Sequence, residues 1–270
     1  MANSKLLNLS TLLLFVVFNT AASGEVFIDD FDNVATLSET GNMSDSPDPH
    51  WWLNSGAYFY RANGIASTVT GELSGIDRFR LLYAASNPID TDNGYRPQNI
   101  FRLVTLGKFK NFTQQVFFNI KNINLSASPN RNQSNGVLFF HRYQDGKNLY
   151  YAGIRVDGFA IVKKKSQGRY YELKSVAVYP GAYNRETLPN LLPVNRWVGL
   201  KTVIADTANG SVDISLYLND QQLGPGWTKV LEIEDTGADI ERILTPGYAG
   251  IRSDFMDVNF NHYEAAENQN

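Results

Sequence analysis

Side chains that could bind a charged ligand and move protons are concentrated in one stretch, FFHRYQDGKNLYYAGIRVDGFAIVKKKSQGRYY, from Phe139 to Tyr171. It contains a histidine, several tyrosines, two arginines before the last turn and three consecutive lysines. Imidazole can take a proton near neutral pH, and a tyrosine can act as acid or base when a cation lowers its pKa. Lysine and arginine pair with carboxylates, and tyrosine rings offer stacking area. The set suits an acidic sugar.

Tight turns divide this stretch into short strands. Asp157-Gly158 between two apolar runs predicts a two-residue hairpin, which would pair Tyr151 with Lys164. The loop Gln144–Asn148 would pair the strands on either side of it so that His141 faces Tyr151. A base, a phenol and an ammonium would then lie next to one another, because directly opposed side chains sit about 4.5–5.5 Å apart at Cβ.

The next turn extends this row to a fourth strand. The turn Ser166–Arg169 would place Tyr171 opposite Lys164. Gly153 lies beside the row and would leave a gap in which a ligand approaches the backbone closely. The opposite face would be the core face. The expected exposed row is His141, Tyr151, Lys164 and Tyr171, with Arg155 beside it, and the expected core face holds Leu138, Phe140, Ala152, Ile154, Val156, Phe159 and Ile161.

Two interpretations of this row stay open. Tyr, Lys and Arg are ordinary residues on the solvated face of an antiparallel sheet. The alternative is a sugar-binding groove. The choice depends on the register, since a slip of one residue would exchange the two faces.

The first residues read as a secretory signal. Met1–Lys5 is a short basic start, Leu6–Asn19 is mostly apolar, and Thr20–Gly24 supplies small residues for cleavage. We therefore expect residues 1–23 to be removed, residues 24–270 to form one domain, and the protein to be secreted, extracellular or periplasmic, without a membrane span. The chain has no cysteine, which excludes disulfides, thiol catalysis and cysteine metal sites. Its formal charge of −3 argues against nucleic-acid binding.

Short alternating runs separated by Gly, Asn, Asp and Pro cover the rest of the chain, at the spacing of sandwiches and barrels. They predict an all-β protein with two antiparallel sheets. Phe79–Tyr83 is among the expected strands, and Asp239–Leu244 is the one expected helical piece. A long loop, Ser86–Gln98, precedes a strand, and loops of this length are often functional. Side chains at this loop that we expect to rim the groove are Arg96, Asn99 and Arg102, and Tyr143 would contribute a further ring.

Several motifs together resemble the concanavalin A-like lectin/glucanase superfamily, in its laminin-G-like and polysaccharide-lyase-like jelly-roll branches. They are FIDDFDN, WWLNSGAYFY, DTDNGYRPQNIFRLVT, GVLFFHRYQDGKNLYYAGIRVDG, NRWVGLK and GYAGIRSDFMDVNFNHY, spread over Val26–Tyr263. The resemblance implies a jelly roll of two curved sheets, the concave one binding glycan. It also implies a calcium ion joining the first and last strands. Asp30 and Asp257 sit at the matching places, with Asp32 in reserve, and acidic strand ends without metal are the alternative.

The glucanases of this fold carry a Glu-x-Asp-x-Glu strand, and the nearest text here, Glu232-Ile-Glu234-Asp235, lacks that order. The Arg-x-Glu-x-Arg and Gln-Ile-His strands of the alginate lyases are absent as well. The residue types of the predicted row nevertheless favour a lyase that cleaves a uronate glycan by β-elimination. It would require no cofactor, and a structural calcium is what the resemblance adds. Its catalytic groups would be His141, Tyr151, Lys164 and Arg155. The rival is a non-catalytic, lectin-like glycan-binding or adhesion protein, and a weaker third is a structural matrix protein. In each case we expect a monomer, and for the first two an extracellular polysaccharide as partner.

Overall fold

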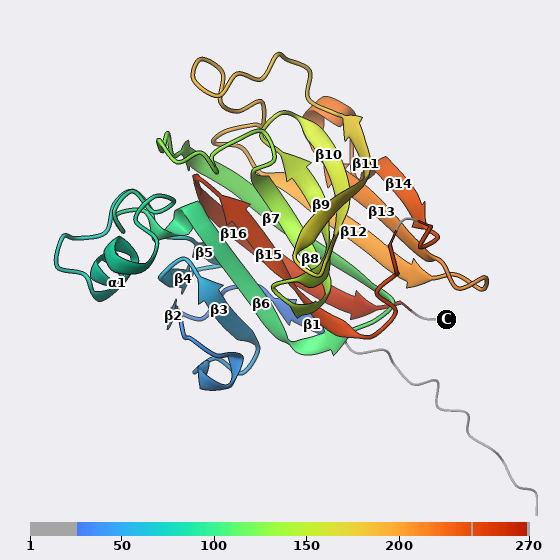
Figure 1. Cartoon of the computed structure of the whole chain (residues 1–270), viewed down its shortest axis with the longest axis horizontal. Coiled ribbons are helices and arrows are strands. Elements are labelled where there is room, and N and C mark those ends of the chain that lie inside the picture. The colour runs from blue at the N-terminus through green and yellow to red at the C-terminus, as the bar shows by residue number, and fades with distance from the viewer. Residues whose placement is uncertain (1–25, 239, 269–270) are drawn as a thin grey trace, which may run out of the picture.

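The computed structural model describes residues 26–238 and 240–268, and the predicted signal peptide, residues 1–23, lies outside them. Two antiparallel sheets form the body of the protein, stacked face to face (Figure 1). Sheet A has the order β14-β13-β12-β7-β16-β5-β4-β2, with β1 also paired to β16. Its strands are β1 (Val26–Asp29), β2 (Ala35–Ser38), β4 (Tyr58–Ala62), β5 (Ile65–Ser67), β7 (Phe112–Ile123), β12 (Val198–Asp206), β13 (Val212–Asn219), β14 (Thr228–Asp235) and β16 (Met256–Glu267).

Sheet B has the order β11-β10-β9-β8-β15-β6-β3 and faces the viewer in Figure 1. Consecutive strands from β8 to β11 are joined by short turns, whereas β15 reaches the sheet from the far end of the chain and separates β8 from β6. The strands are β3 (Trp51–Ser55), β6 (Ile100–Phe109), β8 (Gly136–Asp145), β9 (Asn148–Arg155), β10 (Phe159–Ser166), β11 (Arg169–Ala177) and β15 (Gly247–Asp254). The prediction of an all-β, two-sheet antiparallel jelly-roll sandwich is confirmed.

One apolar core fills the space between the sheets, built from the inward half of each alternating strand. Aromatic rings dominate it: Trp51 and Tyr263 meet edge to face at 4.7 Å. Their polar atoms are paired, since the Trp51 indole N–H donates to Asp29 Oδ2 at 2.8 Å and the Tyr263 hydroxyl to Gln114 Oε1 at 3.0 Å. Each such ring adds about 1.5–3 kcal/mol of burial free energy.

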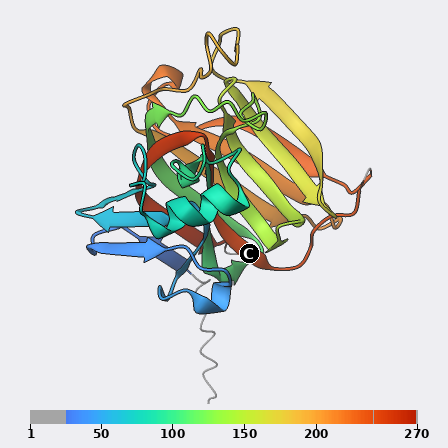
Figure 2. The ribbon, with the colours of Figure 1, turned by 60° about the vertical axis from the view of Figure 1, so that its left-hand side comes forward.

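Within residues 26–238 and 240–268, helical structure is limited to α1 (Arg78–Ser86) and the short turns η1 (Met43–Asp45), η2 (Pro97–Asn99) and η3 (Gln221–Leu223). Helix α1 belongs to a lobe outside the sheets, between β5 and η2, which Figure 2 brings forward. The prediction of a strand at Phe79–Tyr83 is therefore wrong. Asp77 caps the helix by accepting from the N–H of Phe79 at 2.8 Å, and Phe79 and Tyr83, four residues apart, share its buried side. Residues 240–244, expected to be helical, are irregular. Among the described residues, no helix has the length and apolar character needed to cross a membrane.

Candidate functional site

The face of sheet B that points away from the core carries a second apolar layer. Side chains alternate along β8 and β9, so Phe139 and Tyr150 enter the core while Phe140 and Tyr151 project outward. The outward pair is directly opposed, with ring centroids 5.4 Å apart. These outward residues are nevertheless buried, together with Trp52, Val104, Leu138, Leu149 and Ile161. This layer is the floor of a groove.

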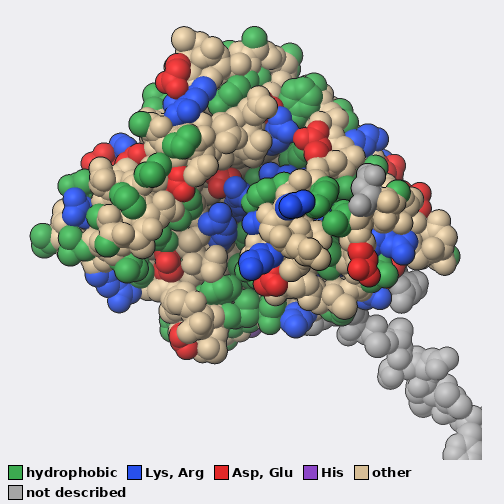
Figure 3. Space-filling model, viewed as in Figure 1, with side chains coloured by type: hydrophobic (Ala, Val, Ile, Leu, Met, Phe, Trp, Pro, Cys, Tyr) green, Lys and Arg blue, Asp and Glu red, His purple; other side chains and the backbone are tan. Residues whose placement is uncertain are grey.

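The groove consists of two adjoining cavities of about 490 Å³ and 220 Å³, which share Arg102 and Tyr170. Figure 3 looks onto this face and shows Lys and Arg side chains gathered in a hollow near the centre of the molecule. Strands that are distant in sequence supply the charges, five cations against three carboxylates. The cations are Arg102 (β6), Arg155 (β9), Lys163 and Lys165 (β10) and Arg252 (β15), and the carboxylates are Asp90, Glu172 and Asp254.

Two tyrosines and two lysines form the centre of the groove. The rings of Tyr151 on β9 and Tyr170 on β11 lie 5.9 Å apart. The ammonium of Lys163, on the strand between them, lies 5.4 Å from the Tyr151 ring centre and 5.2 Å from that of Tyr170. Lys165 lies 4.7 Å from the Tyr170 ring. Lys163 and Lys165 have no carboxylate within ion-pair distance in the described part of the chain. They are therefore available to an anionic ligand.

The crowding of positive charge changes how these groups titrate. Burial, with a contribution from the nearby charge of Arg252, lowers the pKa of Lys163 to about 8. Burial by itself would raise the pKa of Tyr170, but the positive charges of Arg252 and Lys165 outweigh it and lower that pKa to about 8. Burial raises the pKa of Tyr151 to about 12. The two phenols are thus unequal, and Tyr170 is the one that ionises near physiological pH.

Arg252 lines the larger cavity. Its Nε lies 2.9 Å from each carboxylate oxygen of Asp254, and its guanidinium lies 5.3 Å from the Tyr151 ring centre. Its Nη1 is buried and has no hydrogen-bond partner among the described residues. A buried guanidinium N–H without a partner is costly, and a ligand oxygen would satisfy it.

The remaining cations are held in place by protein groups. Arg155 pairs with Asp157 and, at 3.4 Å, with Glu172. Arg102 donates from Nη1 to Ser55 Oγ and to the Ile100 carbonyl, each at 3.2 Å. These bonds hold the Arg102 guanidinium in the groove. No carboxylate of the described ranges lies within ion-pair distance of it.

The prediction that His141 shares this exposed face is wrong. His141 is fully buried in the core, where its Nε2 lies 2.6 Å from Thr202 Oγ1. Burial and the neighbouring charge of Arg142 lower its pKa to about 3. It is therefore a neutral core histidine, and it does not reach the groove.

Lys164 and Tyr171 are also misplaced by the predicted register. Lys164 points inward, where its ammonium lies 2.7 Å from Asp235 Oδ2 and 2.7 Å from the Ile240 carbonyl. Tyr171 is paired with Lys164 as predicted, and it therefore lies on the same inward side, at the edge between β11 and β14. The four residues of the predicted row do not share one face. Tyr151 and Arg155 alone of the predicted catalytic set line the groove.

These misplacements have one physical reason. The register of β9 with β10 and that of β8 with β9 each differ by one residue from the prediction. Three residues, Val156 to Gly158, join β9 to β10, with Gly158 in the left-handed region at φ +84°. A three-residue hairpin commonly ends in this way, and it places Lys163, not Lys164, opposite Tyr151. Between β8 and β9, an irregularity at Arg142, φ +47°, shifts His141 opposite Tyr150.

Gly153 does not leave a gap for a ligand, contrary to the prediction. A Cβ at this position would lie 2.3 Å from the Val137 carbonyl oxygen and 2.6 Å from the Leu138 Cα. The space is filled by the backbone of β8. The glycine lets two strands approach closely, which is a structural role.

Of the other predicted ligand-binding residues, Arg102 and Tyr143 line the groove. Arg96 does not, because its guanidinium pairs with Glu72 at 2.8 Å and Asp92 at 3.2 Å. Asn99 is buried, with its Nδ2 2.8 Å from the Asp90 carbonyl oxygen.

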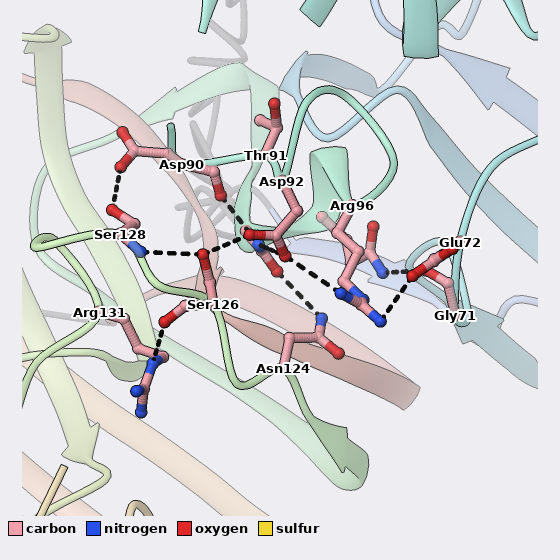
Figure 4. A network of polar contacts seen from close by, with 12 residues as sticks. Gly71, Glu72, Asp90, Thr91, Asp92, Arg96, Asn124, Ser126, Ser128 and Arg131 are labelled. Carbon is pink, nitrogen blue, oxygen red and sulfur yellow. Dashed lines mark hydrogen bonds and ion pairs between the residues drawn. The ribbon is translucent and has the colours of Figure 1, made fainter. Parts of the chain in front are cut away.

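Arg96 and Asn99 belong to a polar network that joins two loops, through the bonds of Arg96 to Asp92 and of Asn99 to Asp90 and Asn124. Figure 4 shows this network. Ser128 donates to Asp90 at 2.5 Å and Ser126 to Asp92. The network fixes the end wall of the larger cavity, to which Asp90, Asn130, Asn132 and Asn135 contribute side chains.

The predicted calcium ligands do not come together. Asp257 is buried and accepts from the Gly71 N–H at 2.9 Å, Gln98 Nε2 at 2.9 Å and Asn124 Nδ2 at 3.0 Å. Asp30 lies beside the middle of β16, where it is 2.5 Å from His262 Nδ1. Five residues of strand, about 16 Å, separate the two positions along β16. No group of three or more His, Cys, Asp or Glu side chains is arranged to hold a metal within residues 26–238 and 240–268. Asp30 and Asp257 therefore do not fit one ion.

Sequence reasoning missed Tyr170, Lys163, Lys165 and Arg252. The first three follow from the correct hairpin register, and Gly158 at the end of a three-residue turn was the available signal. Arg252 could be placed in the groove only by knowing that β15 inserts between β8 and β6, a pairing between segments more than a hundred residues apart.

Comparison with known proteins supplies structural neighbours only. No family model and no curated protein matches the sequence. Similar solved structures include a carbohydrate-binding module from Bacillus subtilis (TM-score 0.48, 13% identity, 79% of this chain and 94% of that one). A second is a mutant of the GH43 protein BlXynB from Bacillus licheniformis, with a TM-score of 0.47 and 13% sequence identity. The match covers 95% of this chain and 41% of that one. A third is a beta-glucanase from Bacillus licheniformis, with a TM-score of 0.47 and 12% sequence identity. The match covers 91% of this chain and 99% of that one. These likenesses concern architecture alone, and the two-sheet topology described above agrees with the predicted concanavalin A-like fold.

Proposed function

We propose that the protein binds an acidic polysaccharide in the groove of sheet B. The observation that carries this proposal is the centre of the groove, where Lys163 and the Nη1 of Arg252 lack protein partners in the described chain beside the rings of Tyr151 and Tyr170. A uronate residue supplies both complements, a carboxylate for the cations and an apolar ring face for the tyrosines. Asn130, Asn132 and Asn135 in the end wall suit sugar hydroxyls.

The test is binding to polygalacturonate, alginate and hyaluronate, each compared with its carboxyl-reduced form, by calorimetry at low and moderate salt. The expected result is binding of at least one acidic polymer and its loss on carboxyl reduction. Lys163→Met should weaken that binding by about tenfold, the effect of losing about 1.4 kcal/mol. Equal binding of an acidic polymer and its reduced form would contradict the proposal.

One observation favours a second candidate function, cleavage of the bound chain by β-elimination. Burial alone would raise the pKa of Tyr170, but the charges of Arg252 and Lys165 lower it to about 8, so a useful fraction is phenolate near neutral pH. The phenolate would remove the proton next to the uronate carboxylate, whose charge the cations neutralise. The electron pair forms the new double bond as the adjacent glycosidic C–O bond breaks, and the departing oxygen takes a proton from the Tyr170 phenol. The step needs no cofactor or oxidant.

Release of unsaturated, ultraviolet-absorbing ends from a bound uronate polymer tests this second candidate. Tyr170→Phe should abolish release and leave binding within about threefold, because the ring stays in place. Binding without release by the unaltered protein would assign the protein to the lectin-like alternative.

A further inference from the structure

The opposite side of the molecule, the outer face of sheet A, carries a compact aromatic and cationic strip. It lies over β7, β12 and β13 and consists of Phe117, Lys201, Tyr217 and Trp227. The strip shares no residue with the groove, since the two lie on the outer faces of different sheets.

The strip is built around a glycine. A Cβ at Gly199, in β12, would lie 2.7 Å from the Cη2 atom of the Trp227 indole and 3.0 Å from a ring carbon of Phe117. Phe117 is the register partner of Gly199, and its ring centre lies 5.7 Å from that of Trp227. Because Gly199 carries no side chain, the indole settles against the sheet between its neighbours. The rings of Phe117 and Trp227 therefore lie half-buried and close to the sheet.

A single ammonium is fixed above these rings. Lys201 Nζ lies 4.6 Å from the Trp227 ring centre and 4.9 Å from that of Tyr217, its register partner on β13. No carboxylate lies within ion-pair distance of Lys201 in residues 26–238 and 240–268, whereas Lys229, also on sheet A, pairs with Glu232 at 2.9 Å. Lys201 is thus a positioned cation outside ion-pair distance of the described carboxylates, and the charge of Glu264 acts on it from further away, opposing the lowering of its pKa by burial.

The chemistry of the strip indicates its occupant. Lysine is depleted from the centres of protein interfaces, so an unpaired ammonium amid the rings argues against a protein partner. A sugar chain with anionic groups fits both features, since its ring faces stack on aromatics and its charge complements Lys201. We infer that this strip is a second binding site for an acidic polysaccharide, so that one molecule bridges two chains. The choice of polymer rests on the proposed function.

The experiment measures binding and bridging separately. Affinity for the uronate polymer that binds best is measured by calorimetry, and bridging by light scattering of protein and polymer mixed at varied ratios. The strip variants are Lys201→Met and Trp227→Leu, and Lys121→Met is the matched control, an exposed lysine of β7 outside the strip. Lys163→Met is the groove variant. Thermal melting of each variant reports whether it is folded.

Unaltered protein should scatter strongly near equivalence, and both strip variants should abolish the scattering while groove binding continues. In the Lys163→Met background, each strip variant should weaken the remaining binding by about fivefold or more, the loss expected from a stacking or cation–π contact. Lys121→Met should change neither quantity.

Other outcomes separate the two proposals. Folded strip variants that bridge chains and bind as the unaltered protein does would overturn the second site and leave the groove proposal standing. Complete loss of binding in Lys163→Met, with the strip unaltered, would likewise overturn the second site and leave the groove proposal standing. Normal binding in the groove variant with complete loss in the strip variants would support the strip and overturn the groove. Failure of the unaltered protein to bind any acidic polymer would overturn both.

Discussion

Lys163 and Lys164 are consecutive residues whose ammonium groups lie on opposite sides of sheet B. Lys163 lies in the groove, 5.2 Å from the Tyr170 ring centre and 5.4 Å from that of Tyr151. Lys164 points into the protein and lies 2.7 Å from Asp235, whose carboxylate also accepts from the Tyr150 hydroxyl at 2.6 Å. The strand therefore places one lysine in the groove that we propose binds ligand and its neighbour in an internal ion pair.

Exchanging each lysine for methionine should separate these roles. Lys164→Met leaves the Asp235 carboxylate buried without its cation, and it should lower the free energy of unfolding by about 3–5 kcal/mol. Lys163→Met removes a cation that has no carboxylate partner in the described part of the chain, and it should leave stability within about 0.5 kcal/mol while weakening acidic-polymer binding. Chemical denaturation and calorimetry on the two variants, under one set of conditions, make the comparison. The reverse assignment of effects would contradict the observed register.

The same pair shows how far the sequence could be interpreted. Alternation and turn residues predicted the strands of β8 to β11 and therefore the two-sheet architecture, because these signals are local. The register was not predicted, because it depends on an irregularity at Arg142 and on a third residue in the turn before Phe159. One residue of slip moved His141 and Lys164 into the interior. Placing Arg252 in the groove would have required knowing that β15 pairs with β8, a strand more than a hundred residues earlier. The expected strand at Phe79–Tyr83 is part of helix α1, because a short apolar run fits either a helix or a strand.

Binding of an acidic polymer should weaken as the pH rises through about 8. Lys163 has a pKa lowered to about 8, so it is cationic below that pH and neutral above it. Tyr170 has a pKa lowered to about 8, so it is neutral below that pH and anionic above it. Both titrations make the groove less positive as the pH rises, and both oppose binding of a carboxylate. Calorimetry from pH 6.5 to 9.5, spanning roughly 1.5 units on each side, measures the effect.

Two variants assign the midpoint of that pH profile. Lys163→Met with Tyr170→Phe should remove most of the pH dependence, because neither replacement titrates. A control at Lys108, a lysine 5.0 Å from the Tyr248 ring on the same sheet, should leave the profile unchanged when replaced by methionine. A profile that stays the same in the double variant would place the titrating group elsewhere.

His141 should make the protein less stable in mild acid. Its pKa is lowered from 6.5 to about 3 by burial, so the unfolded chain binds a proton in this range while the folded protein does not. The contribution to stability is complete above pH 6.5 and is lost as the pH falls from 6.5 toward 3, by up to about 1.4 kcal/mol per pH unit. His141→Gln carries no titrating group and should show a shallower decline of unfolding free energy. Parallel pH profiles for the two proteins would mean that His141 is solvated.

Asp257 provides the test of the calcium expectation. Its two carboxylate oxygens accept from three N–H groups, those of Gly71, Gln98 and Asn124. In Asp257→Asn, one carboxylate oxygen becomes an NH₂ group that faces donors, which should cost about 1–3 kcal/mol of unfolding free energy. Chelation of calcium should leave the melting temperature of the unaltered protein unchanged, because this carboxylate stabilises the fold through amide hydrogen bonds. A fall in melting temperature on chelation, matched by the loss in Asp257→Asn and not additive with it, would instead make Asp257 a metal ligand.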